Sequence, residues 1–191
     1  MLPEDLQRLS DDMDAADAAA ERLSASLTDE EFFWQPDGGT RWSVAQCLDH
    51  LAVADGLYGA AIASAVARAR EQGWRRQGPA APGFFGRMFA DSFEPPVKRR
   101  TGGPAKIRPR PGRTRAETLA DYRAAHDAIR RAIQDVAELD VNRATFQNPF
   151  IPVIRMRVST GLHVIAAHDR RHLWQAEHVV QALRTRRGVV A

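Results

Sequence analysis

Two histidines four residues apart near the C-terminal end of the chain have the spacing of metal ligands. His168 and His172 belong to the run His-Asp-Arg-Arg-His. On a helix, side chains at this spacing lie one turn apart on the same face, with Cβ atoms about 6 Å from one another, so one cation could contact both imidazoles. A third ligand from another helix would leave an open position, as catalytic zinc sites require, whereas structural zinc sites are usually closed by four protein ligands.

The helix wheel separates this pair from the neighbouring histidines. At 3.6 residues per turn, His172 lies about 40° from His168, whereas His163 lies about 140° away and His178 about 80° away on the opposite side. These two are therefore predicted to point elsewhere. His126 is either a partly buried histidine with satisfied hydrogen bonds or a pocket residue. The pair itself is also compatible with two buried, merely hydrogen-bonded histidines, so spacing alone leaves metal binding open.

The residues between the pair argue against a zinc peptidase. In the zinc-protease helix a glutamate directly follows the first histidine, whereas here that position holds Asp169, which has a shorter reach. Arg170 and Arg171 are expected on the surface or in ion pairs. Trp42 and Trp174 are expected to be packing groups rather than substrate contacts.

Four long segments show the apolar periodicity of amphipathic helices, and little indicates strands. The predicted helices cover approximately residues 3–27, 43–72, 114–139 and 156–183. Ser43 with Gln46 and Thr114 with Glu117 predict capping boxes at the start of the second and third helices. His50 borders the apolar stripe of the second helix and can therefore point inward. Both motif histidines take core positions of the last helix.

The predicted fold is all-α, a four-helix bundle formed by a single domain over residues 1–191. Residues 28–36 are predicted to form a turn. The Pro/Gly-rich insertion at about residues 73–113 is predicted to be a long crossover loop, so that helices two and three run the same way, with a short amphipathic helix over Phe84–Phe93. A connection of this length is often a lid, a binding loop or a disordered segment.

A net charge of +3 conceals an acidic body with one basic loop over about residues 97–113. No acidic residue occurs between Glu94 and Glu117. The eight cations of this region are Lys98, Arg99, Arg100, Lys106, Arg108, Arg110, Arg113 and Arg115. We expect a solvated segment; the alternatives are an anion-binding lid, a dimer contact or a nucleic-acid arm. Nucleic-acid binding is disfavoured because the charge is confined to one loop rather than forming a stripe on a helix or sheet.

Cysteine usage and the first residues indicate a cytoplasmic protein. Cys47 is the single cysteine, so no internal disulfide is possible, and residues 1–14 are acidic and amphipathic rather than signal-like. No run approaches the length of about 18 apolar residues that indicates a membrane span, so no membrane association is expected. Cys47 lies one turn before His50, and we expect it to be a core residue rather than a ligand.

Two motifs resemble the DinB-like superfamily of metal-binding four-helix bundles. The segment Trp-Ser-Val-Ala-Gln-Cys-Leu-Asp-His-Leu at residues 42–51, preceded by Trp34 and Pro36, resembles the second-helix signature of that family. The segment His-Asp-Arg-Arg-His-Leu-Trp-Gln at residues 168–175 is similar to its last-helix motif. The motifs lie in the expected order, and the predicted helices cover nearly the whole chain.

The resemblance implies a metal site made by His50, His168 and His172, with water or substrate in the remaining positions. Zinc, nickel or iron is usual in such proteins, and imidazole suits all three. Characterised members include bacillithiol- and mycothiol-dependent S-transferases and a mycothiol-dependent isomerase, which implies a small-molecule substrate and a low-molecular-weight thiol cosubstrate. A metal at an open site can deprotonate a bound thiol or water, so no catalytic side chain is assigned.

The main hypothesis is therefore a metal-dependent enzyme that transfers a low-molecular-weight thiol to an electrophile. One alternative is a noncatalytic bundle that binds a small molecule or a partner and carries a structural metal. Another is a metal-dependent hydrolase. An apolar flank of the bundle could also pair two protomers into a homodimer.

Overall fold

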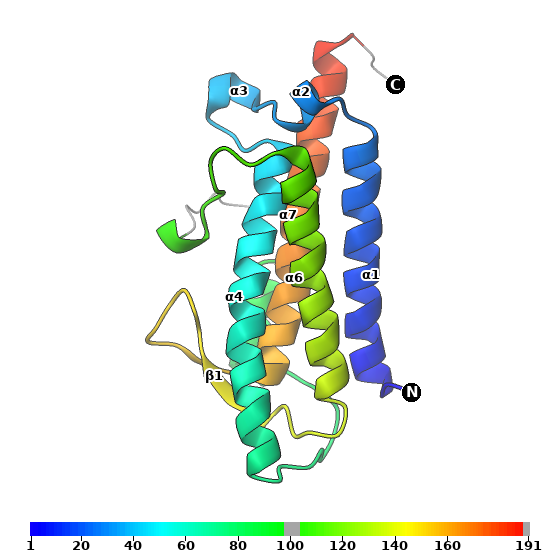
Figure 1. Cartoon of the computed structure of the whole chain (residues 1–191). Coiled ribbons are helices and arrows are strands. Elements are labelled where there is room, and N and C mark those ends of the chain that lie inside the picture. The colour runs from blue at the N-terminus through cyan, green and yellow to red at the C-terminus, as the bar shows by residue number, and fades with distance from the viewer. Residues whose placement is uncertain (98–103, 189–191) are drawn as a thin grey trace.

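Four long helices that run side by side dominate the molecule (Figure 1). The computed structural model describes residues 1–97 and 104–188. The four helices are α1 (Glu4–Ala25), α4 (Val44–Glu71), α6 (Arg115–Asp135) and α7 (Val158–Arg186). Each lies within a few residues of a segment predicted from periodicity, and the Ser43 and Thr114 capping boxes both form. The chain is therefore mostly helical.

Helices α4 and α6 run in the same direction, whereas α1 and α7 run in the opposite one (Figure 1). Asp49 and Asp121 share Arg110 at one end of the parallel pair, and Arg70 contacts Asp135 at the other. Helix α4 packs against α6 and α7, and α1 packs against the same two helices. The connection from α4 to α6 therefore returns along the molecule. It contains α5 (Phe84–Asp91), close to the predicted Phe84–Phe93 helix, and η1 (Ala105–Ile107).

Several short elements were not indicated by the sequence pattern. The predicted turn contains two one-turn helices, α2 (Asp29–Phe32) and α3 (Pro36–Gly39). Thr28 and Glu31 form a capping box for α2, a signal that was readable in the sequence. Strands β1 (Thr145–Gln147) and β2 (Arg155–Arg157) pair antiparallel before α7. Three residues are too few to display a period of two, which explains why these strands escaped prediction.

Helix α4 is the central apolar helix. It ends at Glu71 and is followed by Gly73, whose φ of +62° allows the Gly73 N–H to reach the Arg70 carbonyl and the Trp74 N–H to reach the Ala69 carbonyl. Among the described helices, α4 is the one that is long and apolar enough to cross a membrane by length and composition, and 56% of its most apolar window is buried inside the protein.

The apolar core consists of two clusters arranged along the helices. One includes Leu6, Ile62, Ile129 and Ile165, and the other includes Leu48, Leu51, Ala176 and Leu183. Where the two clusters meet, three of the long helices carry buried polar residues: His50 and Asp55 on α4, His126 on α6, and His168, Asp169 and His172 on α7. Burying polar groups is costly unless they are paired or bind an ion, so packing alone does not explain this polar layer.

Candidate metal centre

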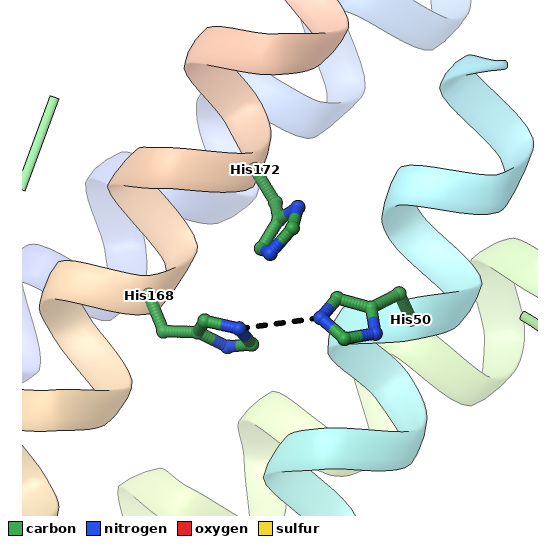
Figure 2. Close-up of side chains that lie close together, drawn as sticks. All are labelled: His50, His168 and His172. Carbon is green, nitrogen blue, oxygen red and sulfur yellow. Dashed lines mark hydrogen bonds between the residues drawn. The ribbon is translucent and has the colours of Figure 1, made fainter. Parts of the chain in front are cut away.

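The three histidines predicted as ligands lie together in the polar layer. His50 of α4 faces His168 and His172 of α7 (Figure 2), and one ring nitrogen from each lies within 4.8 Å of the others. The Nε2 atoms of His50 and His168 are 3.2 Å apart. All three residues are buried. The fold thus brings together residues 118 and 122 positions apart in the sequence.

The donor atoms of this cluster fit a shared metal ion. Two nitrogens bound at about 2.05 Å to one tetrahedral zinc ion would be about 3.3 Å apart, close to the spacing between His50 and His168. The Nδ1–H of His50 donates to the Ile107 carbonyl, which leaves Nε2 with its lone pair toward the centre. The Nε2 atoms of His50 and His168 are within hydrogen-bond distance, but the Nδ1 atoms of His168 and His172 are buried without a partner among the described residues, so hydrogen bonding accounts for only part of the cluster.

All three imidazoles are held in the neutral form that metal ligation requires. Burial lowers the pKa of His50, although the Ile107 contact opposes this shift. Burial and the neighbouring His50 and Arg171 lower the pKa of His168 to about 3. Burial, followed by the proximity of the other two rings, also lowers the pKa of His172 well below its usual value. At neutral pH no ligand has to lose a proton before a metal binds.

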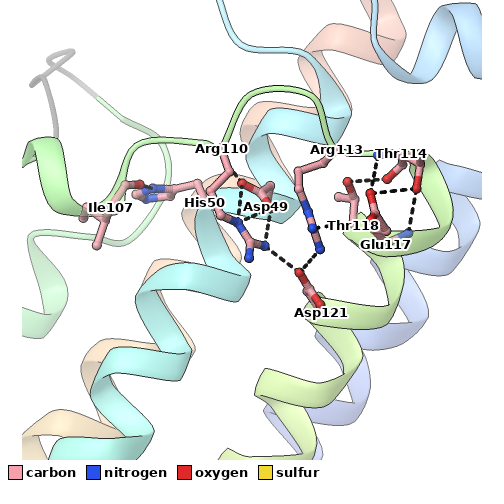
Figure 3. A network of polar contacts seen from close by, with 9 residues as sticks. All are labelled: Asp49, His50, Ile107, Arg110, Arg113, Thr114, Glu117, Thr118 and Asp121. Atoms are coloured by element: carbon pink, nitrogen blue, oxygen red, sulfur yellow. Dashed lines mark hydrogen bonds and ion pairs between the residues drawn. The ribbon is translucent and has the colours of Figure 1, made fainter.

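The last residue of η1 and the segment that follows it hold His50 in place (Figure 3). Ile107 accepts its Nδ1–H, and the Arg110 backbone N–H donates to Asp49 Oδ2 at 2.6 Å. The Arg110 guanidinium also binds both Asp49 and Asp121, joining α4 to α6. Asp49 is buried and adjacent to His50 in the sequence. The Ile107 contact therefore restrains the ring of His50, and the Arg110 contacts to Asp49 restrain its backbone.

Several cations of the predicted basic loop contact the body of the protein. Arg113 pairs with Asp121, and Arg115 pairs with Asp29. The expectation of a solvated segment therefore does not hold for Arg113, which joins the loop to α6, while Arg115 is the first residue of α6 and joins it to α2. The cations Lys98 to Arg100 lie outside the described residues.

A cavity of about 580 Å³ opens onto the three histidines. Its lining is rich in aromatic side chains, including Trp42, Phe89, Phe93 and Trp174, and it contains the cations Arg41 and Arg171. None of the described lining residues is Asp or Glu. Trp42 also stacks on His172, with 5.6 Å between ring centroids, so it both packs a ligand and lines the cavity. The cavity is of the size that holds a small molecule.

The remaining candidates from the sequence separate clearly from the cluster. His163 Nε2 contacts the Ala80 carbonyl and His178 Nδ1 contacts the Trp174 carbonyl, and neither joins the other three rings, as predicted. Cys47 lies in the apolar core, where burial raises the pKa of its thiol, so its assignment as a core residue is confirmed.

The two arginines of the last-helix motif have different surroundings. Arg170 binds Glu94 and Asp12, which confirms the expected ion pairing. Arg171 lines the cavity, a role that the sequence analysis missed. The sequence offered one signal for this role: Arg171 directly precedes His172, so on the helix its side chain lies about 100° around the axis from that histidine.

His126 is a core residue and not part of the cavity lining. It is fully buried, and its ring nitrogens face the carboxylates of Asp17, Asp55 and Asp169. Neither a partly buried histidine nor a pocket residue describes it. The sequence analysis missed these aspartates, although Asp55 stands on the otherwise apolar stripe of α4 and was readable as an exception there.

Comparison with known proteins agrees with the two histidine motifs. The family model of the DinB superfamily matches residues 12–176, a range that contains all three clustered histidines and most of the four long helices. No curated protein and no solved structure matches the chain. The DinB superfamily match and the three-histidine group fit a metal-binding protein. The chain belongs to the DinB superfamily.

Proposed function

We propose that this chain is a metal-dependent thiol S-transferase built on a four-helix bundle. The observation that carries the proposal is the placement of three neutral imidazoles, from His50, His168 and His172, beside a cavity of about 580 Å³. Three protein ligands leave coordination positions for a substrate. The described cavity lining contains no carboxylate, so the nucleophile must be one that needs no carboxylate base.

A zinc, nickel or iron ion bound there would lower the pKa of a thiol or of water. Within the chain, the three histidines hold the site, and the contact from Ile107 keeps the ring of His50 in place. Trp42 and Phe93 exclude water and contact the apolar part of an electrophile. The thiol sulfur forms a bond with the electrophilic carbon, the leaving group departs with its electron pair, and the thiol proton passes to solvent.

The cations of the cavity favour an anionic group on one of the two substrates. Both Arg41 and Arg171 line the cavity; Arg41 is paired with Asp37, whereas Arg171 has no carboxylate partner among the described residues and is the cation available to a substrate. A guanidinium binds carboxylates and phosphates through paired N–H groups. A low-molecular-weight thiol that carries a carboxylate matches this arrangement.

A hydrolase is the second candidate because the same open site would accept water. It is less well supported, since the pKa of water lies far above that of a thiol, and no carboxylate lines the described cavity to take a proton from a bound water. A noncatalytic small-molecule carrier is the third candidate. The aromatic lining of the cavity supports a carrier as well as it supports an enzyme.

The proposal extends to the setting of the enzyme: a cytoplasmic homodimer that acts on small molecules and not on nucleic acid or membranes. Phe84, Phe85 and Met88 are exposed on α5 and support a contact between protomers. Light scattering on the purified chain and on a Phe85→Ser variant tests the dimer; equal dimer mass for both would exclude this surface.

The activity test uses a panel of low-molecular-weight thiols with a chromogenic aryl halide. The wild-type chain and the control His163→Ala should turn over, chelation should abolish turnover, and added zinc, nickel or iron should restore it. His168→Ala should lose about 100-fold in rate, because one ligand is missing. Thiol turnover that survives chelation would contradict the proposal. Ester hydrolysis without thiol transfer would favour the hydrolase, and neither activity would favour the carrier.

A further inference from the structure

A second buried cluster of ionisable side chains lies in the polar layer beside the three histidines. It consists of Asp17 on α1, Asp55 on α4, His126 on α6 and Asp169 on α7, so each long helix contributes one member. The side chains of Asp55, His126 and Asp169 are at most 1% exposed. This aspartate–histidine cluster is not part of the cavity and has no role in the proposed transferase chemistry.

Hydrogen bonding does not account for the arrangement around His126. Its Nε2 atom lies 3.5 Å from Asp55 Oδ2 and 3.6 Å from Asp169 Oδ2, whereas a charge-assisted N–H···O bond spans about 2.7–2.9 Å. Both carboxylate oxygens of Asp55 and of Asp169 are buried without a hydrogen-bond partner among the described residues. Buried carboxylates are normally hydrogen-bonded, paired at close range or bound to a metal.

The same distances match donor atoms arranged around an ion. Ligand atoms about 2.1 Å from a tetrahedral zinc ion lie about 3.4 Å from one another. One donor atom each from Asp55, His126 and Asp169 lies within 4.8 Å of the others. Asp17 Oδ1 lies 2.8 Å from His126 Nδ1 as an ion-pair contact without hydrogen-bond alignment, so a carboxylate stands on the side of the ring opposite the Nε2 atom.

The charge of the cluster also calls for a cation. Asp17 is paired with Arg130, which leaves the buried carboxylates of Asp55 and Asp169 opposite one imidazole. A divalent cation beside a neutral imidazole would balance both. One proton on His126 and a second on Asp55 would balance both carboxylates without a metal, and the metal count below separates these two states.

We propose that Asp55, His126 and Asp169 form a second divalent-cation site, with Asp17 positioning the His126 ring. Two carboxylates and one imidazole suit zinc, iron or manganese. The site is closed to the cavity and joins three helices, so its role is to fix α4 and α7 relative to each other next to His50 and His168. The inference stands independently of the transferase proposal.

The test removes the three-histidine site and asks whether metal remains. A His50→Ala/His172→Ala chain is purified without a histidine tag from zinc-supplemented medium, and zinc is counted by mass spectrometry. We expect one equivalent to remain. Adding Asp55→Asn should remove it, whereas adding the control Asp127→Asn, an exposed carboxylate on α6, should not. No zinc in the double variant, or zinc retained after Asp55→Asn, would overturn the second site.

X-ray absorption on zinc in the double variant provides a measurement that does not depend on the folding of Asp55→Asn. A first shell of one imidazole with carboxylate oxygens supports the proposal, and a shell without carboxylate oxygens overturns it. Equal zinc content in the wild-type and double-variant chains would instead count against the three-histidine site. The two proposals therefore fail in distinguishable ways.

Discussion

His50 donates its Nδ1–H to the backbone carbonyl of Ile107, although the two residues are 57 positions apart in the sequence. This contact leaves Nε2 as the nitrogen that faces His168 and His172. The neighbouring Asp49 is bound by Arg110 from the same segment. The connection between α4 and α6 is therefore part of the candidate metal centre, because it sets the tautomer and position of one of the three clustered histidines.

Arg110→Ala is expected to weaken metal binding about tenfold, since His50 would lose the restraint beside it. The variant should also lower the free energy of unfolding by about 2 kcal/mol, because Asp49 would stay buried without its guanidinium partner. Zinc titration against a competing chelator and urea unfolding measure the two effects. The control is Arg70→Ala, whose exposed pair with Asp135 should contribute less than about 1 kcal/mol. Indistinguishable zinc affinities for the two variants would contradict the positioning role.

The metal-free protein should lose stability as the pH falls from about 6.5 toward 3. The pKa of His168 is about 3 in the folded chain and about 6.5 when unfolded. In that window the unfolded chain takes up a proton that folded His168 does not, so stability falls by up to about 1.4 kcal/mol per pH unit. Above pH 6.5 neither state binds this proton, and the dependence ends.

His168→Asn should flatten this acid dependence, because asparagine does not titrate. Urea unfolding of the chelator-treated wild-type and variant chains between about pH 4 and pH 7 provides the comparison. The contribution of His172, whose pKa is also lowered, should remain in both chains. Parallel pH profiles for the two proteins would show that folding does not lower the pKa of His168.

Arg171→Ala should raise the KM for a carboxylate-bearing thiol about tenfold, equivalent to about 1.4 kcal/mol, and leave the zinc content unchanged. The reason is the position of Arg171 in the cavity lining, outside the three-histidine cluster. The matched control is Arg170→Ala, which removes a pair with Glu94 and should not change KM. An equal KM change for a thiol without a carboxylate would show that Arg171 does not recognise the anionic group.

Two glycine substitutions test the packing of the helices that carry the ligands. A Cβ at Gly161 of α7 would lie 2.6 Å from Phe146 Cζ, so Gly161→Ala should destabilise the chain by about 1–3 kcal/mol. A Cβ at Gly56 of α4 would meet no atom within 4 Å, so Gly56→Ala should stabilise it by up to about 1 kcal/mol through helix propensity. Urea unfolding should shift the two midpoints in opposite directions; a stabilising Gly161→Ala would refute the packing.

The three-histidine site was predictable because its members lie on long, periodic helices. Spacing placed His168 and His172 on one face and excluded His163, while the resemblance to the DinB-like superfamily supplied the role of His50. The contact between His50 and Ile107 was not predictable, because it depends on the path of a Pro/Gly-rich segment that has no periodicity.

The aspartate–histidine cluster was predictable only in part. Asp55 interrupts an apolar stripe and was visible as a buried polar position, but its neighbours come from α6 and α7. Which side chains meet there depends on how three helices pack, and helical periodicity describes only one helix at a time. The residue pattern could therefore have indicated that Asp55 is buried, although the sequence analysis missed it, but not that Asp55 faces His126.

The central claim is that His50, His168 and His172 together hold a metal ion, and metal counting tests it most directly. Zinc is measured by mass spectrometry in the wild-type chain, in His168→Ala and in the control His163→Ala, all purified without a histidine tag. The account predicts that His168→Ala holds one equivalent of zinc fewer than the wild type and that His163→Ala matches the wild type. Equal zinc content in all three chains would contradict it.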